Sequence, residues 1–300
     1  MSYPRRFAFS AVVGLMYAYA AFVASRVSNV DYLLDMRPWG SSQYSCAVLE
    51  VKCPRQDTLG DAAILQRAIE ITASDYAQVL ILSHCPQLRI PVVLQSLSNL
   101  RMLKIYNSTI VQWLFAIVCT RRSASYLPGF AEDFAFSVWD IELPISNLTT
   151  LPDRAATAWK GVVLIVWECN PQLQIIPDAL LKLPLLWYLM LGSNSIRSIG
   201  DAAFVNSTVQ HVVLDGNPLE ALAASMQGLA SIGVIQTEVA TFPLSWYSVK
   251  RSDGHQTYVM ATRSPLCTSK QVPPSSFTVD CVRTREALQL SDEFRGFMAT

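Results

Sequence analysis

The sequence predicts an α/β fold in which short parallel strands stack side by side and are joined by return segments. Three observations support this. A ladder of apolar residues recurs at a nearly constant step, a small residue able to turn inward follows each expected strand, and hydrophobic residues make up 51% of the 300 residues against 15% charged ones. A chain of this length can bury one sizeable core.

The ladder is clearest in residues 186–196 and 209–219, which carry apolar residues at the same positions. An asparagine follows the strand in each copy, at Asn194 and Asn217, and 23 residues separate every matched position. Because side chains alternate between the two faces of a strand, we expect Leu189 and its equivalents to point into the core. One copy cannot bury its apolar face alone, so neighbouring copies are expected to stack.

Weaker copies extend the pattern in both directions. The residues that follow the seven expected strands are Cys85, Ser108, Ser146, Cys169, Asn194, Asn217 and Thr237. The steps between them are 23, 38, 23, 25, 23 and 20 residues, and the long step places an insertion at about residues 117–135. These side chains are expected to turn inward and to bond backbone groups that the turn leaves unpaired. Cys85 and Cys169 are therefore expected to be buried, packing as small hydrophobes.

An alternative is an ordinary α/β domain whose buried strands are evenly spaced. The small polar residue after each strand argues against it, since an ordinary buried strand does not require one at that position. The stretch from Gln43 to Cys281 instead resembles extracellular leucine-rich-repeat ectodomains, particularly those of receptor-like or membrane-anchored proteins of plants and oomycetes. Leu-Pro-type pairs at 151–152, 176–177 and 242–243 fit that group. The resemblance implies a solenoid: a short curved horseshoe of about seven repeats with a parallel concave sheet.

The expected organisation has five parts. They are a signal peptide or N-terminal signal-anchor helix (1–24), a linker and N-terminal cap (25–76), leucine-rich repeats (77–244), a C-terminal cap (245–281) and a tail (282–300). Residues 7–24 form an uncharged apolar stretch after Arg5 and Arg6. It suits a cleaved signal, with 18–20 as the cleavage motif, and it is also long enough to anchor the chain in a membrane. A buried soluble helix is the third reading.

Both export readings place the rest of the chain in an extracellular or lumenal compartment. Three N-glycosylation sequons agree with this, at Asn107, Asn147 and Asn206.

Cysteines near the ends of the array also agree, since disulfides form in oxidising compartments. We expect the pairs Cys46–Cys53 and Cys267–Cys281, while Cys119 lies in the insertion. No cysteine spacing indicates a zinc site.

The sequence offers little for catalysis. It contains three histidines and none of the common nucleophile, zinc or phosphate-binding motifs. We therefore expect no enzymatic activity, no cofactor and no metal site. The formal net charge of zero gives no electrostatic footprint for nucleic acid.

The outward positions of the strands predict a binding surface on the concave face, because repeat proteins bind partners there. Many of these positions hold aromatic or apolar residues of the kind enriched in protein interfaces. The candidate partner-binding residues are Tyr106, Trp139, Ile165, Trp167, Trp187, Tyr188, Met190, His211 and Asp215. We expect them to bind a protein or peptide ligand. Alternatively, the insertion covers this surface, or some of the rings pack between repeats.

Three functions follow as expectations. The first is a non-catalytic recognition ectodomain, secreted or anchored by residues 7–24. The second is a secreted inhibitor of another organism's enzymes, which differs from the first only in its partner. The third is an intracellular scaffold, which would have free thiols and no glycan.

Overall fold

The computed structural model describes residues 31–36, 45–72, 77–113, 138–248, 256–269 and 271–282. The expected signal or anchor helix at 1–24, the insertion at 117–135 with Cys119, and the tail beyond Val282 lie outside the described residues. Within the described ranges, no helix has both the length and the apolar character needed to cross a bilayer.

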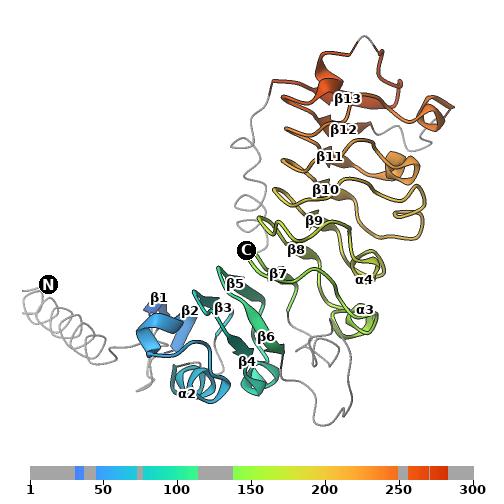
Figure 1. The fold of residues 1–300 in the computed structure, drawn as a ribbon. Helices are drawn as coiled ribbons and strands as arrows, with labels where there is room; N and C mark the ends of the chain where they lie inside the picture. The colour runs from blue at the N-terminus through green and yellow to red at the C-terminus, as the bar shows by residue number, and fades with distance from the viewer. Residues whose placement is uncertain are drawn as a thin grey trace, which may run out of the picture.

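One large sheet organises the chain (Figure 1). Ten of its eleven strands run parallel and follow one another in chain order, and the first strand pairs antiparallel with the second. The strands are β1 (Asp31–Met36), β2 (Ser45–Lys52), β3 (Val79–Ser83), β5 (Met102–Tyr106), β7 (Asp140–Glu142), β8 (Leu164–Val166), β9 (Tyr188–Met190), β10 (His211–Val213), β11 (Ser231–Gly233), β12 (Thr257–Met260) and β13 (Phe277–Asp280).

All seven strands expected from the ladder are present, as β3, β5 and β7 to β11. The parallel sheet also continues into the ranges expected to be caps, through β2 at one end and β12 and β13 at the other.

The return segments lie across the core from the sheet (Figure 1) and contain short helices and a second, two-stranded sheet. The helices are α2 (Ala62–Thr72), α3 (Ala155–Ala158), α4 (Asp178–Leu181) and the 3-10 turns η1 (Cys53–Gln56), η2 (Val92–Ser96), η3 (Ala224–Gly228), η4 (Leu244–Ser248) and η5 (Pro265–Cys267). The second sheet pairs β4 (Leu88–Ile90) with β6 (Ile110–Trp113) in parallel.

Between the sheet and the return segments runs one continuous hydrophobic core. The strand register aligns its central column across neighbouring repeats: Leu49, Leu80, Leu103, Ile141, Ile165, Leu189, Val212, Ile232 and Val259. Each of these side chains is fully buried. The expectation that Leu189 and its equivalents point inward is thus confirmed.

In the repeat around β8 the predicted register is wrong by one position. Ile165 pairs with Leu189, and the Trp167 N–H donates to the Met190 carbonyl at 2.8 Å. Ile165 and Trp167 are both 0% exposed and belong to the core, so they are not candidates for a binding surface. Leu164 and Val166 take the outward positions instead.

In the correct register, Asn170 and not Cys169 is the residue that turns inward after the strand. The Asn170 Nδ2 donates to the carbonyls of Glu168 at 2.8 Å and Leu143 at 3.3 Å, and the residue is 0% exposed. Cys169 is exposed and has a free thiol, contrary to the expectation that it is buried.

Asparagines do the same in the next two repeats. Asn194 Nδ2 donates to the carbonyls of Trp167 (2.7 Å) and Leu191 (2.8 Å), and Asn194 Oδ1 accepts the Asn170 N–H at 2.8 Å. Asn217 Nδ2 donates to Leu191 and Leu214. Each asparagine thus joins its own turn to the preceding strand, and the expected inward role of this position is confirmed for Asn194 and Asn217.

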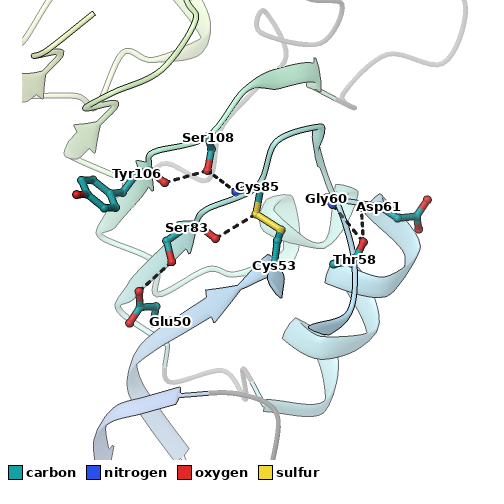
Figure 2. Close-up of a disulfide and its surroundings, with 9 residues drawn as sticks. All are labelled: Glu50, Cys53, Thr58, Gly60, Asp61, Ser83, Cys85, Tyr106 and Ser108. Atoms are coloured by element: carbon teal, nitrogen blue, oxygen red, sulfur yellow. Dashed lines mark hydrogen bonds between the residues drawn. A yellow bond between two sulfur atoms is a disulfide. The ribbon is translucent and has the colours of Figure 1, made fainter. Parts of the chain in front are cut away.

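Two disulfides join cysteines within the described residues. Cys267 pairs with Cys281, as predicted. At the other end Cys53 pairs with Cys85, with the two Cα atoms 5.1 Å apart (Figure 2). The predicted pair Cys46–Cys53 is therefore wrong. Cys53 directly follows β2 and Cys85 follows β3, and the parallel pairing of these strands brings the two strand exits side by side.

Candidate functional site

The side of the sheet that faces away from the core, here called the outer face, carries two columns of side chains. The first column is Val48, Val79, Met102, Asp140, Leu164, Tyr188, His211, Ser231, Tyr258 and Thr278. The second column is Glu50, Ile81, Lys104, Glu142, Val166, Met190, Val213, Gly233, Met260 and Asp280.

An apolar cluster occupies the middle of the outer face. Leu164, Val166 and Met190 form a buried group separate from the main core, and Tyr188 and Val213 pack against it. We call these five residues the apolar patch. Tyr188 and Val213 are partly exposed, and protein interfaces are enriched in aromatic residues and methionine, so the apolar patch is the candidate binding site.

Aromatic rings border the apolar patch. The rings of Tyr188 and His211 stack with centroids 4.4 Å apart and an interplanar angle of 7°. Trp187 lies at 6.3 Å from the His211 ring and is 47% exposed. The His211 Nδ1 forms a hydrogen bond with the Ser231 Oγ at 2.7 Å. Burial raises the pKa of Tyr188, partly offset by a hydrogen bond from the Trp187 side chain.

The two columns carry four carboxylates, at Glu50, Asp140, Glu142 and Asp280, and one lysine. That lysine, Lys104, forms an ion pair with Glu142 at 2.8 Å. Asp140 and Glu142, both ionisable, are buried. The outer face is therefore acidic around its apolar centre, in a chain whose formal net charge is zero.

The structure divides eight of the nine predicted site residues into three groups. Tyr188, Met190 and His211 lie in the two columns, and Trp187 directly precedes β9. Tyr106, at the end of β5, is exposed and contacts His84 edge-on at 5.5 Å, while Trp139 is half-buried before β7. Ile165 and Trp167 belong to the core, as described above.

Asp215 has a structural contact. Its Oδ1 accepts the Ile235 N–H at 2.8 Å, and the residue is 1% exposed. This bond joins two successive strand exits. The carboxylate also leaves little room for a side chain at position 233 in the next repeat, because a Cβ added at Gly233 would approach Asp215 Oδ1 to 2.9 Å.

Leu164 and Val166 are residues of the apolar patch that the sequence prediction missed. Both lie in an unbroken apolar run at 162–167. Where every residue is apolar, alternation cannot show which ones face the core. The signal that could have found them is Asn170, which matches Asn194 and Asn217 in type.

A hollow lies at the edge of the sheet where the strands end. A cleft of about 450 Å³ is lined by residues from four successive turns, including His84, Asn107, Ile145, Asn147 and Cys169. The Asn107 Nδ2 lies 2.8 Å from the His84 Nδ1. Among the described residues, no hydrogen bond joins the Cys169 thiol to a base, and no group of three His, Cys, Asp or Glu side chains could hold a metal ion.

The three sequons should differ in glycan occupancy. Asn147 Oδ1 accepts the Ile110 N–H at 2.8 Å and Nδ2 donates to the Ile110 carbonyl at 3.2 Å. This two-point contact uses the amide hydrogen on the same side as Oδ1, which is the hydrogen that a glycan replaces. Asn206 is exposed. We therefore expect folded protein from a secretory host to carry a glycan at Asn206 and none at Asn147.

Glycopeptide mass spectrometry after enzymatic deglycosylation in heavy-oxygen water measures occupancy at each site. The change Asn206→Gln serves as a control and should remove the main glycan. Full occupancy of Asn147 in correctly folded protein would contradict the expectation.

His211 should make stability depend on pH. Burial lowers the pKa of this imidazole from its ordinary 6.5. The unfolded chain then binds the proton more readily than the folded chain, so stability is lost as the pH falls through and below about 6.5. Urea unfolding at pH 8 and at pH 5 should show a drop at the lower pH that is smaller in the His211→Asn variant. Equal drops in the two proteins would exclude His211 as a source of the dependence.

Comparison with known proteins gives distant likenesses among solved structures. No protein-family model matches the chain. No curated protein sequence matches it either. A solved structure of the Toll–Spatzle complex, described as a molecular hub in Drosophila development and innate immunity, is 17% identical with a TM-score of 0.47, and the match covers 71% of this chain and 27% of that one. The chain thus corresponds to about a quarter of the length of that structure.

Proposed function

We propose that this chain is a non-catalytic leucine-rich-repeat solenoid that recognises a protein or peptide partner outside the cell through its outer face. The observation that carries the proposal is the apolar patch with its bordering rings, Trp187 and His211. Protein interfaces are enriched in aromatic residues and methionine. Hot spots favour Trp and Tyr, and both are present at Trp187 and Tyr188.

Two features support an extracellular location. The disulfides Cys53–Cys85 and Cys267–Cys281 are a type of bond that persists in oxidising compartments and is rare in the cytosol. The three sequons agree with passage through a secretory route. These disulfides weigh against an intracellular scaffold, which would have free thiols.

Binding through the outer face can be tested with the double variant Trp187→Ala/Tyr188→Ala. The native chain and the variant are each immobilised and incubated with the proteins secreted by the cells that produce the chain. The amount of each protein retained by the native chain is then compared with the amount retained by the variant. Loss of two hot-spot residues, each about 2 kcal/mol, should lower retention more than tenfold.

The matched control is Ile175→Ala, since Ile175 is exposed at 62% on the return segment before α4. Circular dichroism confirms that the variants are folded. If the folded double variant retains the partner as well as the native chain does, the outer face is not the binding surface.

A further inference from the structure

The cleft at the strand exits is lined by uncharged polar groups and by apolar ones. It measures about 450 Å³ and crosses the turns that follow β3, β5, β7 and β8. Asn107, Thr109 and Gln172 present exposed amide and hydroxyl groups there. No Asp, Glu, Lys or Arg stands among the described residues of the lining. Amides and hydroxyls both donate and accept hydrogen bonds, so the lining suits an uncharged polar ligand such as a sugar.

Asn107 would attach such a ligand to one wall of the cleft. It is exposed and begins the sequon formed with Ser108 and Thr109. N-glycosylation joins the anomeric carbon of N-acetylglucosamine to the Asn107 Nδ2, breaks the bond from that carbon to its lipid diphosphate donor, and releases one amide proton. The attached sugar carries uncharged hydroxyl and acetamido groups, which match the lining.

The contact between Asn107 and His84 is compatible with this bond. The Asn107 Nδ2 lies 2.8 Å from the His84 Nδ1. Because an amide nitrogen only donates, Nδ1 accepts and the imidazole proton is on Nε2. A glycosylated amide retains one N–H, which is sufficient for this contact. Asn147 on the next turn differs, since both its amide oxygen and its amide nitrogen are bonded to Ile110.

Ile145 gives the cleft an apolar wall in an unfavourable backbone conformation. It is 41% exposed and its φ is 54°. Among the described non-glycine residues with positive φ, Ile145 alone is β-branched. Such a conformation is rare for β-branched residues, and strained residues cluster at functional sites. In the bare chain this isoleucine gains neither full burial nor a relaxed backbone, whereas the acetyl methyl of a sugar on the neighbouring turn would cover it.

We propose that Asn107 carries an N-glycan whose first sugars lie in the cleft, over Ile145 and towards Cys169. These residues follow adjacent strands, which are about 4.8 Å apart. Ile145 is therefore one spacing from Asn107, and Cys169 is two. The proposal rests on the extracellular location in the proposed function, because the glycan is added along a secretory route. It does not depend on a partner of the outer face.

Alkylation of Cys169 tests whether the sugars occupy the cleft. This free thiol is exposed and lines the cleft. The full chain, secreted from a eukaryotic host, is treated with iodoacetamide, and peptide mass spectrometry follows the reaction at Cys169. The variant Thr109→Ala removes the sequon and leaves Asn107 and His84 in place. We expect Cys169 to react at least fivefold more slowly in the glycosylated native chain than in Thr109→Ala.

Two further variants distinguish a glycan seated in the cleft from one that shields the thiol by its bulk. Ile145→Gly relieves the positive φ and removes the apolar wall while Asn107 stays glycosylated. In that background, adding Thr109→Ala should change the rate at Cys169 by less than twofold. Asn206→Gln removes the sequon of an exposed site outside the cleft lining and should leave the rate as in the native chain. Circular dichroism confirms that each variant is folded.

Equal rates in Thr109→Ala and in a native chain with Asn107 occupied would mean that the sugars point into solvent, and the proposal would be wrong. Full protection of Cys169 in glycosylated Ile145→Gly would contradict the seat on Ile145. A bare Asn107 beside an occupied Asn206 would overturn the proposal and leave the extracellular location standing. If both asparagines were bare, the result would count against the location as well. The retention test with Trp187→Ala/Tyr188→Ala is independent of all these outcomes.

Discussion

Replacing Trp167 with alanine should lower the free energy of unfolding by about 3–5 kcal/mol, the usual cost of emptying a buried tryptophan site. Trp167 is 0% exposed in the core behind β8. Its loss would leave a cavity between Leu143 and Leu191, the equivalent residues of the two flanking repeats. Urea unfolding followed by circular dichroism measures the change.

Two further variants make the test specific to the register. Trp167→Phe keeps most of the packing and removes an indole N–H that has no hydrogen-bond partner among the described residues, so we expect a loss below about 1.5 kcal/mol. Val166→Ala removes only two methyl groups from the outer face and should cost about 1.5 kcal/mol. If Trp167→Ala cost no more than Val166→Ala, Trp167 would face outward as the sequence first suggested.

The ladder predicted most of the sheet because its spacing is a direct consequence of stacking. Strands that pair in parallel with their neighbours need the same apolar positions in each repeat, and the Leu189 column satisfies this from β3 to β11. The prediction failed only around β8. There, 162–167 is apolar throughout, and Cys169 stands at the expected distance after Val166, as Cys85 does after Leu82. The prediction that Ile165 and Trp167 face outward therefore fitted the pattern as well as the correct register did.

The first disulfide was missed for a related reason. Pairing Cys46 with Cys53 treats the stretch before β3 as a cap, whereas β2 is a strand of the same parallel sheet. In such a sheet, residues at equivalent strand exits are neighbours in space although a whole repeat separates them in sequence. Had β2 been recognised, Cys53 and Cys85 would have been the natural pair.

The second large effect is expected from Asn194→Ala, which should destabilise the chain by about 3–5 kcal/mol. The variant leaves the carbonyl of Trp167 and the N–H of Asn170 without their present partners, while the Leu191 carbonyl loses one of two donors and keeps Asn217 Nδ2. A buried polar group left unsatisfied costs about 1–3 kcal/mol, and alanine offers no replacement. Because Asn194 is 6% exposed, water has poor access to the vacated groups. Urea unfolding measures the loss, and Asn206→Ala is the matched control, expected within about 0.5 kcal/mol of the native chain.

Hydrogen exchange shows whether the loss arises at the predicted bonds. The Asn170 N–H donates to Asn194 Oδ1, whereas the Ile196 N–H donates to Asn217 Oδ1 at 3.0 Å and keeps its partner in the variant. Under conditions where both proteins are folded, the Asn170 amide should exchange much faster in Asn194→Ala and the Ile196 amide should change far less. Equal acceleration of the two amides would mean that the asparagine stabilises the array as a whole. A cost below 1 kcal/mol would mean that these three contacts do not join the repeats.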